Sequence, residues 1–580
     1  MKATRRLFGY LRPYRKWVVL APLMMILEIS MDLMQPRMVQ AIVDQGVAHH
    51  DMRLVFLLGA RMVLFAFIGL VGGMGCTYYA VLAAQGGGAD LRRALFAKVQ
   101  ALSFANLDQW ETGTLVTRLT NDVTQFQEVI MILLRMTVRA PILLVGSLIM
   151  ATLTSPRLSI VFVILMPVLL GFLVWIVNKL YPVFSQVQAR LDRVNTVMQE
   201  NLSGVRVVKA FSRSPYEIER FGTANDALTD KNILAARLGS LTMPSVFLCM
   251  NIGVVVVLWY GGNLVVKGDL SVGKIIAFVN YLTQALMSLM MTSMLAIRLS
   301  RSEASSERIE ELLNVEPSVE DAPDANKDRS IVGRVAFEDV SFGYGESDAP
   351  VLSGVSFVAE PGQTIAILGA TGSGKTSLVN LIPRFYDVTS GRVTLDGEDV
   401  RMIPQEVLRR DVGIALQESF LFSGTIRDNI AYGRPEMTDE EVREAARAAQ
   451  ADEFVRTLPE HYESPVEQRG ANFSGGQRQR LAIARALAPE PKVLILDDST
   501  SAVDLRTEAL IVDALKERGP TKFVVTTRIS GVQGADRILV LDDGRLVAQG
   551  THAELMDGSP VYREIFESQQ GAATVDEVGA

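Results

Sequence analysis

The chain has 580 residues, of which 49% are hydrophobic and 21% are charged. This length, together with a mean hydropathy of +0.24, predicts several domains and at least partial burial in lipid, and it disfavours a purely soluble protein. The net charge of −7 is spread along the chain, which argues against a nucleic-acid partner.

The chain begins with residues 1–16, which are basic and aromatic but lack the apolar core and cleavage site of a secretory signal. We interpret them as a cytoplasmic lead-in to a first membrane helix at residues 17–42. That helix carries Glu28 and Asp32 on one face, and Arg61 lies near the start of the next apolar segment. Ionisable groups at membrane depth are candidates for substrate contact, here with a cationic cargo. The competing explanation is that they pair with one another or lie near the outer interface.

Five further apolar segments follow, at residues 62–89, 140–156, 158–178, 238–266 and 275–297. Each is long enough, or nearly so, to cross a hydrocarbon core of roughly 30 Å. Lys and Arg crowd the N-terminus and the stretches 90–139 and 179–237, which places this basic side in the cytoplasm. The apolar spacing of both stretches predicts helices that project beyond the bilayer, with turns near residues 103–113 and 212–216. A membrane domain of six helices is therefore expected over residues 17–314.

The last span carries four methionines at helical spacing, Met287, Met290, Met291 and Met294. Methionine is flexible and polarisable, so these side chains are candidates for contact with a small-molecule or lipid-like substrate. Packing between helices is the competing explanation. The two cysteines, Cys76 and Cys249, lie in apolar stretches and cannot form a disulfide framework, so no oxidising compartment is implied.

The composition changes after the sixth span. Residues 315–332 are polar and contain proline without apolar periodicity, which is typical of a linker. Residues 333–570 alternate short β-branched runs with amphipathic helical runs, which predicts an α/β domain with a largely parallel sheet. Residues 571–580 are expected to form a disordered tail.

A phosphate-binding loop is predicted at "GATGSGKT", Gly369 to Thr376, because it follows the strand "QTIAIL" and opens a helix. Its glycines allow backbone N–H groups to turn inward around phosphates. Lys375 would reach the β and γ oxygens, and the hydroxyl of Thr376 would bind Mg²⁺.

Four further segments accompany this loop in a fixed order. The ring of Tyr344 could stack on a base, although such tyrosines are more often packing residues. The amide of Gln417, at a strand end, could coordinate Mg²⁺ or the attacking water. Residues Ser474 to Gln477 open a helix and offer another anion site. The buried strand "VLILD" ends at Asp497, whose carboxylate suits Mg²⁺, and Asp498 follows it.

Together these segments resemble the nucleotide-binding domain of ABC transporters, and the membrane half resembles the exporter-type domain of that family through "GTLVTRLTNDV" and "NLSGVRVVKAF". The resemblance covers nearly the whole chain. It implies an ATP site formed by Tyr344, Gly369, Ala370, Thr371, Gly372, Ser373, Gly374, Lys375, Thr376, Ser377, Gln417 and Asp497. Mg²⁺ would be held by Thr376, Gln417 and, through water, Asp497. The signature residues, Ser474, Gly475, Gly476 and Gln477, would face the ATP of a partner.

Two positions depart from the family pattern in the same way. The residue after the Walker B acid is usually a catalytic Glu, and here it is Asp498. Its carboxylate is withdrawn on the order of an ångström, and a misplacement of that size costs roughly 100-fold in rate. The switch segment usually supplies a His to the γ-phosphate, and here that position is Thr527. A degenerate site that holds ATP and hydrolyses it slowly is therefore predicted, with slow but tolerated hydrolysis by Asp498 as the alternative.

The resemblance also implies a partner, because two nucleotide domains stack head to tail in this family. We expect a heterodimer with a homologous half-transporter that has an intact Walker B Glu and switch His. The pair is predicted to be a multi-pass exporter of hydrophobic or amphipathic compounds in the cell (inner) membrane, with cytoplasmic nucleotide domains. The alternatives are an ATP-gated channel or regulatory subunit, an exporter-like importer, and a self-sufficient homodimer.

Overall fold

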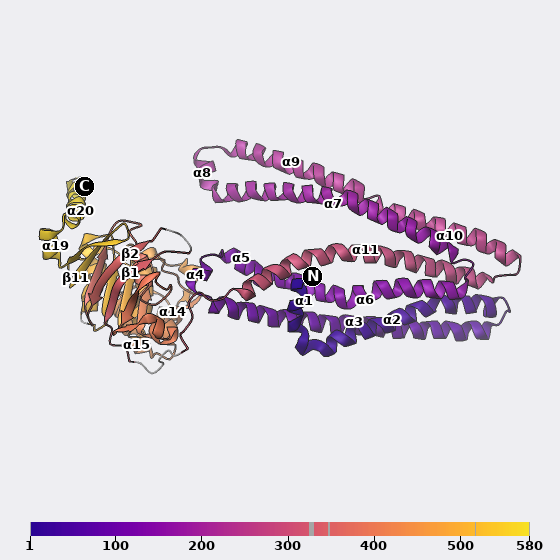
Figure 1. Cartoon of the computed structure of the whole chain (residues 1–580), viewed down its shortest axis with the longest axis horizontal. Helices are drawn as coiled ribbons and strands as arrows, with labels where there is room; N and C mark the ends of the chain where they lie inside the picture. Colours follow the sequence, from indigo (N-terminus) through magenta and orange to yellow (C-terminus); the bar gives the residue numbers. More distant parts are fainter. Residues whose placement is uncertain (1, 324–329, 346–348, 517, 579–580) are drawn as a thin grey trace. The chain divides into compact units, whose positions relative to one another are not determined.

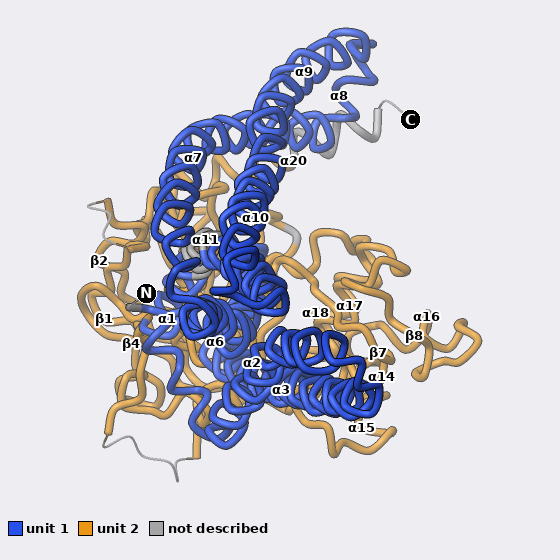
Figure 2. Tube along the Cα trace, turned by 90° about the vertical axis from the view of Figure 1, so that its right-hand side faces the viewer, with its two compact units in different colours: residues 1–100, 112–314 blue, residues 101–111, 315–580 orange. Residues whose placement is uncertain are grey.

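The computed structural model describes residues 2–323, 330–345, 349–516 and 518–578, with the backbone alone at 2, 293–302, 530 and 570–578. It divides into two compact units, shown in blue and orange in Figure 2. The first comprises residues 1–100 and 112–314, and the second comprises residues 101–111 and 315–580. Each unit is described by itself.

The first unit is helical (Figure 1). Its elements are α1 (Lys2–Leu7), η1 (Phe8–Tyr14), α2 (Arg15–Ala41), η2 (Ile42–Val47), α3 (Met52–Ala101), α5 (Thr112–Thr117), η3 (Arg118–Asp122), α6 (Val123–Thr154), α7 (Ile160–Ser203), α8 (Val205–Ala210), α9 (Ser214–Gly239), α10 (Thr242–Val266) and α11 (Val272–Asn314). Within the described residues, six helical stretches are long and apolar enough to cross a membrane, which confirms the predicted six spans.

Close packing between α2 and α3 depends on small residues. A Cβ on Gly72 would lie 2.9 Å from the carbonyl oxygen of Met24, so only glycine fits at this contact. Elsewhere in the unit, the ring of Phe162 on α7 packs against that of Phe278 on α11. The hydroxyl of Tyr281 donates to the carbonyl of Leu33 at 2.8 Å, which joins α11 to α2. These contacts fix α2 beside both α3 and α11.

The long helices α7 and α9 lie side by side and are joined through the short α8 (Figure 1). This tip falls at residues 204–213, close to the turn that the sequence predicts at 212–216. Ser212 has a φ of 52°, in the left-handed region that closes such a turn. Phe211 is exposed at the tip.

The second unit contains two larger sheets and a two-stranded antiparallel sheet of β7 and β8. The six-stranded sheet has the order β12-β11-β3-β10-β9-β6, in which all neighbours but β11 and β12 run parallel. A second, antiparallel sheet has the order β2-β1-β4-β5. The strands are β1 (Val335–Phe342), β2 (Leu352–Ala359), β3 (Thr364–Leu368), β4 (Ser390–Leu395), β5 (Glu398–Asp399), β6 (Val412–Ala415), β7 (Gly424–Thr425), β8 (Pro465–Val466), β9 (Val493–Asp497), β10 (Thr521–Val525), β11 (Arg537–Asp542) and β12 (Arg545–Gly550). The parallel sheet matches the sequence prediction, and the antiparallel sheet is an addition to it.

Helices surround these sheets in the second unit. They are α4 (Phe104–Leu107), α12 (Lys375–Asn380), η4 (Val400–Met402), α13 (Gln405–Asp411), α14 (Ile426–Ile430), η5 (Ala431–Gly433), α15 (Asp439–Ala448), α16 (Asp452–Thr457), η6 (His461–Glu463), η7 (Gln468–Gly470), α17 (Gly475–Leu487), α18 (Leu505–Lys516), η8 (Ile529–Gly531), α19 (His552–Gly558) and α20 (Pro560–Val578). The helix α20 continues to Val578, whereas the sequence predicts a disordered tail from residue 571. Part of the predicted linker, residues 324–329, lies outside the described residues.

The segment 101–111 belongs to the second unit, although the sequence assigns it to the membrane domain. The ring centroid of Phe104 lies 4.3 Å from that of Phe385. The hydroxyl of Tyr386 donates to the carboxylate of Asp108 at 2.7 Å. An aromatic contact and a hydrogen bond therefore anchor α4 in the nucleotide-binding unit.

Candidate nucleotide site and transmembrane cavity

The predicted phosphate loop connects β3 to α12. Gly372 and Gly374 adopt φ angles of 86° and 96°, in the left-handed region that favours glycine. A Cβ on Gly374 would also lie 2.8 Å from a methyl carbon of Leu352. The hydroxyl of Ser373 is buried and has no hydrogen-bond partner among the described residues. The loop thus has the left-handed glycines that let backbone N–H groups turn toward a phosphate, and the hydroxyl of Ser373 is available to bind it.

Lys375 is buried at the start of α12. Its ammonium group donates to the carbonyl oxygens of Gly369 at 2.9 Å and Ala370 at 2.7 Å. Burial lowers the pKa of Lys375, and the carboxylates of Asp497 and Asp498 oppose that change. The cation is therefore held inside the loop, where phosphate oxygens would bind.

The predicted Mg²⁺ ligands lie together. The hydroxyl of Thr376 donates to the carboxylate of Asp497 at 3.1 Å. Asp497 is 1% exposed, and its pKa is raised chiefly by this burial and further by the neighbouring Asp498. Gln417 lines the same cavity, whose volume is about 450 Å³. Hydroxyl, amide and carboxylate oxygens are suitable Mg²⁺ ligands when a nucleotide supplies further oxygens, so the residues fit the metal.

Asp498 and Thr527 line this cavity as well. Asp498 has a φ of 46°, and its backbone N–H donates to the carbonyl of Val525 at 3.0 Å. Asp is several-fold enriched at left-handed positions because its short polar side chain tolerates them, so the local backbone suits an Asp here. The carbonyl of Thr527 accepts a hydrogen bond of 2.7 Å from Gln569 of α20, which holds the switch segment.

Tyr344 lies beside the loop but does not line the phosphate cavity. Its hydroxyl is 2.9 Å from that of Ser377. Its ring makes edge contacts with Phe342 at 4.9 Å and with Tyr386 at 5.2 Å. The residue is 40% exposed, and its proposed stacking on a base stays a prediction.

The signature residues form a separate site. Ser474 caps α17, and Gln477 completes a capping box with it. A Cβ on Gly476 would lie 2.9 Å from the carbonyl oxygen of Ala502, which requires glycine. Ser474 and Gly476 line a cavity of about 390 Å³ that contains Asp504 but no residue of the phosphate loop. Within one chain, the signature residues and Lys375 therefore line different cavities.

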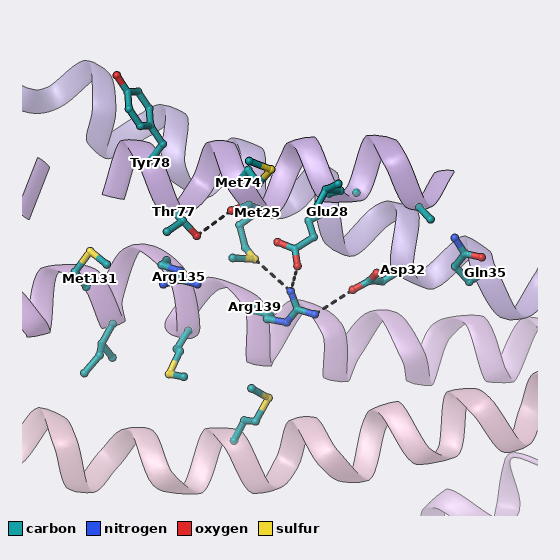
Figure 3. A pocket seen from close by; sticks show the side chains of 17 residues that line it. Met25, Glu28, Asp32, Gln35, Met74, Thr77, Tyr78, Met131, Arg135 and Arg139 are labelled. Carbon is teal, nitrogen blue, oxygen red and sulfur yellow. Dashed lines mark hydrogen bonds and ion pairs between the residues drawn. The ribbon is translucent and has the colours of Figure 1, made fainter. Parts of the chain in front are cut away.

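The first unit contains a cavity of about 1060 Å³ between α2, α3 and α6, with Met291 contributed by α11 (Figure 3). Glu28 and Asp32, two of the predicted substrate candidates, both line it. Arg139 of α6 donates to both carboxylates, at 3.0 Å for Asp32, so the two acids share one guanidinium.

Of the other substrate candidates, Met291 also lines this cavity, whereas Arg61, Met287 and Met290 do not. Arg61 is exposed on α3. Met290 packs against the apolar cluster of α7, α10 and α11 instead, as the packing explanation expects. The side chain of Met294 lies outside those that the structure describes.

Sequence reasoning missed the basic residues of the cavity. Arg135 and Arg139 stand four residues apart on α6 and both line it. They precede residue 140, where the apolar composition predicts the start of the third span, and so fall in the predicted cytoplasmic stretch 90–139. The signal that could have found them is the apolar spacing of residues 123–139, which continues without a break into the span.

Comparison with protein families supports both units. Residues 18–289 match the model of the ABC transporter transmembrane region, and residues 352–501 match the ABC transporter model. The chain is 40% identical over 567 residues to the uncharacterized ABC transporter ATP-binding protein YfiB of Bacillus subtilis, covering 98% of this chain and 99% of that protein. It is 38% identical over 478 residues to a fatty acid ABC transporter ATP-binding/permease protein of Mycobacterium bovis, covering 82% and 75% of the two chains.

A solved structure of a bacterial Atm1-family ABC exporter with ATP bound is also similar. Its TM-score is 0.79 at 27% sequence identity, and the match covers 96% of this chain and 98% of the other. Six spans, a glycine-rich loop beside Asp497 and a separate signature segment thus occur together with a match over nearly the full length. The chain belongs to the ABC transporter family and has an exporter-type transmembrane region followed by an ATP-binding domain.

Proposed function

We propose that this chain is one subunit of a heterodimeric exporter that uses ATP to move hydrophobic or amphipathic compounds out of the cytoplasm or inner leaflet. The observation that carries the proposal is the separation of the signature from the phosphate loop within the chain. A nucleotide bound at Lys375 would need a signature from a second chain, and Ser474 would complete the site of that chain. The six spans favour a multi-pass protein of the cell inner membrane, with its nucleotide domain in the cytoplasm.

The proposed site of this chain binds ATP with Mg²⁺ and hydrolyses it slowly. Lys375, Thr376 and Asp497 support binding, since they meet at one cavity. Asp498 and Thr527 stand there in place of the family's Glu and His. An aspartate is too short to aim the attacking water well, and a threonine hydroxyl lacks the reach and the charge of an imidazole. This reasoning requires a partner with an intact Glu and His, because two copies of this chain would form two weak sites.

The proposed transport cycle uses the asymmetry of the two sites. ATP binding closes the two nucleotide domains and turns the membrane cavity outward, while hydrolysis at the partner's site resets the pair. ATP held by this chain would keep the domains associated between turnovers. The name of the Mycobacterium bovis relative points to a fatty acid as one kind of amphipathic cargo.

Transport by inside-out vesicles tests the proposal. Vesicles that contain this chain and its partner should accumulate an amphipathic dye only when ATP is added, against the dye gradient. Replacing the catalytic Glu of the partner by Gln should abolish accumulation, whereas Asp498→Asn should reduce it much less, because that site contributes little hydrolysis. Downhill flux alone would favour an ATP-gated channel, and equal damage by both substitutions would contradict the asymmetric model.

A further inference from the structure

Arg135 is the unusual member of the membrane cavity. It lies one helical turn before Arg139 on α6 and lines the same cavity (Figure 3). Its Nε atom is buried without a hydrogen-bond partner, and no carboxylate lies within ion-pair distance of its guanidinium among the described residues. Arg139, in contrast, is engaged by Glu28 and Asp32. In this cavity, the guanidinium of Arg139 is paired with carboxylates, whereas that of Arg135 is available to a ligand.

The charges of the cavity explain why an anion suits it. At formal charges, Glu28 and Asp32 are balanced by Arg135 and Arg139, but both acids contact Arg139 alone. A cationic ligand would have to displace Arg139 from its two carboxylates before it could reach them. An anionic ligand meets Arg135 directly. An unpaired charge at membrane depth is costly, so a ligand that pairs with Arg135 gains more there than it would in water.

The walls of the cavity suit an apolar body attached to such an anion. Methionine and aliphatic side chains line it, namely Met25, Met74, Met131, Met136, Met291, Leu70 and Ile132. Methionine adapts to ligands of different shapes because it is unbranched and polarisable. The volume of about 1060 Å³ lies just above the roughly 300–1,000 Å³ range of small-molecule sites. The cavity is therefore large enough to accept an amphiphile with a long apolar chain.

We propose that the cavity binds an amphiphile with one anionic head group, such as a long-chain carboxylate, and that Arg135 is the residue that selects for the head group. The planar guanidinium of Arg135 donates two parallel hydrogen bonds to the oxygens of a carboxylate or phosphate. The methionine walls contact the apolar chain. Glu28 and Asp32, held by Arg139, repel a second negative charge. This inference rests on the proposed transport function for its assumption that the cavity is a cargo site.

Photolabelling tests the inference without requiring transport. The full-length chain in nanodiscs of uncharged lipid is labelled with a diazirine derivative of hexadecanoic acid, and the labelled peptides are mapped by mass spectrometry. Label should fall on peptides of α2, α3 and α6. Arg135→Gln should reduce it roughly tenfold, through the loss of charge-assisted hydrogen bonds, and Arg135→Lys should reduce it less because it keeps the charge. Arg37→Gln is the matched control, since Arg37 is exposed on α2 and does not line the cavity.

Competitors identify the head group that the cavity accepts. Unlabelled hexadecanoate should displace the probe, and hexadecyl phosphate should do so if phosphate head groups are also accepted. Methyl hexadecanoate and hexadecyltrimethylammonium should compete weakly. A neutral diazirine ester should label wild type and Arg135→Gln alike, which shows that the variant is folded. Equal labelling of wild type and Arg135→Gln by the acid probe would overturn the inference, as would stronger competition by the cationic amphiphile.

The photolabelling experiment and the vesicle transport experiment can fail independently of each other. If labelling depends on Arg135 but vesicles show no ATP-driven accumulation, the cavity binds anionic amphiphiles and the exporter proposal fails. If ATP-driven accumulation of a dye occurs but Arg135→Gln does not change labelling by the acid probe, the exporter proposal stands. The proposal that Arg135 selects the head group is then wrong.

Discussion

At the scale of single residues, the proposed nucleotide site keeps the residues expected to bind ATP and lacks those expected to hydrolyse it quickly. The contact between Thr376 and Asp497 holds two of the proposed Mg²⁺ ligands together. The left-handed backbone at Asp498 gives a local reason for an Asp at a position where the family has Glu. Most of the predicted ATP-site residues line one cavity, because loop, amide and acid occur in a known order, although Tyr344 does not line it. The conformation of Asp498 could not be predicted, since a single positive φ leaves no periodic pattern.

The raised pKa of Asp497 predicts how nucleotide binding responds to pH. Burial and the neighbouring Asp498 raise this pKa, so acidification protonates Asp497 at a higher pH than an ordinary aspartate. Mg²⁺ binding needs the carboxylate, so the affinity for Mg²⁺ and a fluorescent ATP analogue should fall as the pH is lowered through that pKa. Asp498→Asn removes one cause of the rise and should move the midpoint to lower pH.

Asp557→Asn provides the control for this titration. Asp557 is exposed on α19, away from the cavity, and its substitution should leave the midpoint unchanged. The titration of the nucleotide itself is common to all variants and cancels in the comparison. A midpoint that moves to higher pH in Asp498→Asn would show that the neighbouring charge does not act on Asp497.

The second residue-scale prediction concerns stability in the membrane unit. Arg139→Gln leaves the carboxylates of Glu28 and Asp32 without their common partner, which should cost on the order of 1–3 kcal/mol of unfolding free energy. The apparent unfolding temperature in nanodiscs should fall, and adding Glu28→Gln to Arg139→Gln should restore part of it.

A surface ion pair serves as the matched comparison. Arg157 pairs with Asp269 at 2.8 Å, and both side chains are largely exposed. Such pairs contribute roughly 0–1 kcal/mol, so Arg157→Gln should change the unfolding temperature little. If Arg157→Gln and Arg139→Gln destabilise the chain equally, the guanidinium of Arg139 contributes no more to the free energy of unfolding than a surface ion pair does.

At the scale of elements, the sequence predicts the spans better than their ends. Apolar length identifies the six spans, and helical spacing predicts the extensions that become α7 and α9. The start of α6 was missed, because Arg135 and Arg139 made a membrane segment look cytoplasmic. The antiparallel sheet was also missed, since it joins strands whose pairing depends on tertiary contacts. The position of α4 in the second unit rests on Phe104 and Asp108, which carry no sequence signal of their own.

The contacts of α4 give a prediction about coupling. Its segment connects two membrane helices, and the hydroxyl of Tyr386 holds it through Asp108 at 2.7 Å. Burial and this hydrogen bond raise the pKa of Tyr386, so the phenol stays protonated and donates. Tyr386→Phe removes the bond, worth about 0.5–1.5 kcal/mol, and should weaken the stimulation of ATPase activity by cargo.

Tyr432→Phe is the matched control for this variant. The ring of Tyr432 stacks on Phe422 at 4.6 Å, and the substitution keeps that stack. Cargo stimulation should therefore match wild type in the control, when both variants are measured with the partner in nanodiscs. Unchanged stimulation in Tyr386→Phe would show that the aromatic contact of Phe104 alone suffices to couple α4.

At the scale of the whole molecule, the chain is a half-transporter whose signature and phosphate loop face different cavities. The match over the full length shows an exporter-type ABC transporter chain. The proposal of an unequal pair rests on Asp498 and Thr527, which occupy the positions of the family's Glu and His. The predicted asymmetry depends on residue identity at two motif positions and so can be proposed from the sequence, whereas the cargo depends on a cavity that only the fold assembles.

The most direct test compares ATP turnover by the purified chain alone with that of a double variant in which the family's Glu and His replace Asp498 and Thr527. The wild-type chain should bind ATP with Mg²⁺ yet hydrolyse it slowly in nanodiscs. Asp498→Glu combined with Thr527→His should raise the rate by roughly 100-fold or more, since both substitutions restore groups that position and activate water. Brisk hydrolysis by the wild-type chain alone, unchanged by the double substitution, would contradict the account.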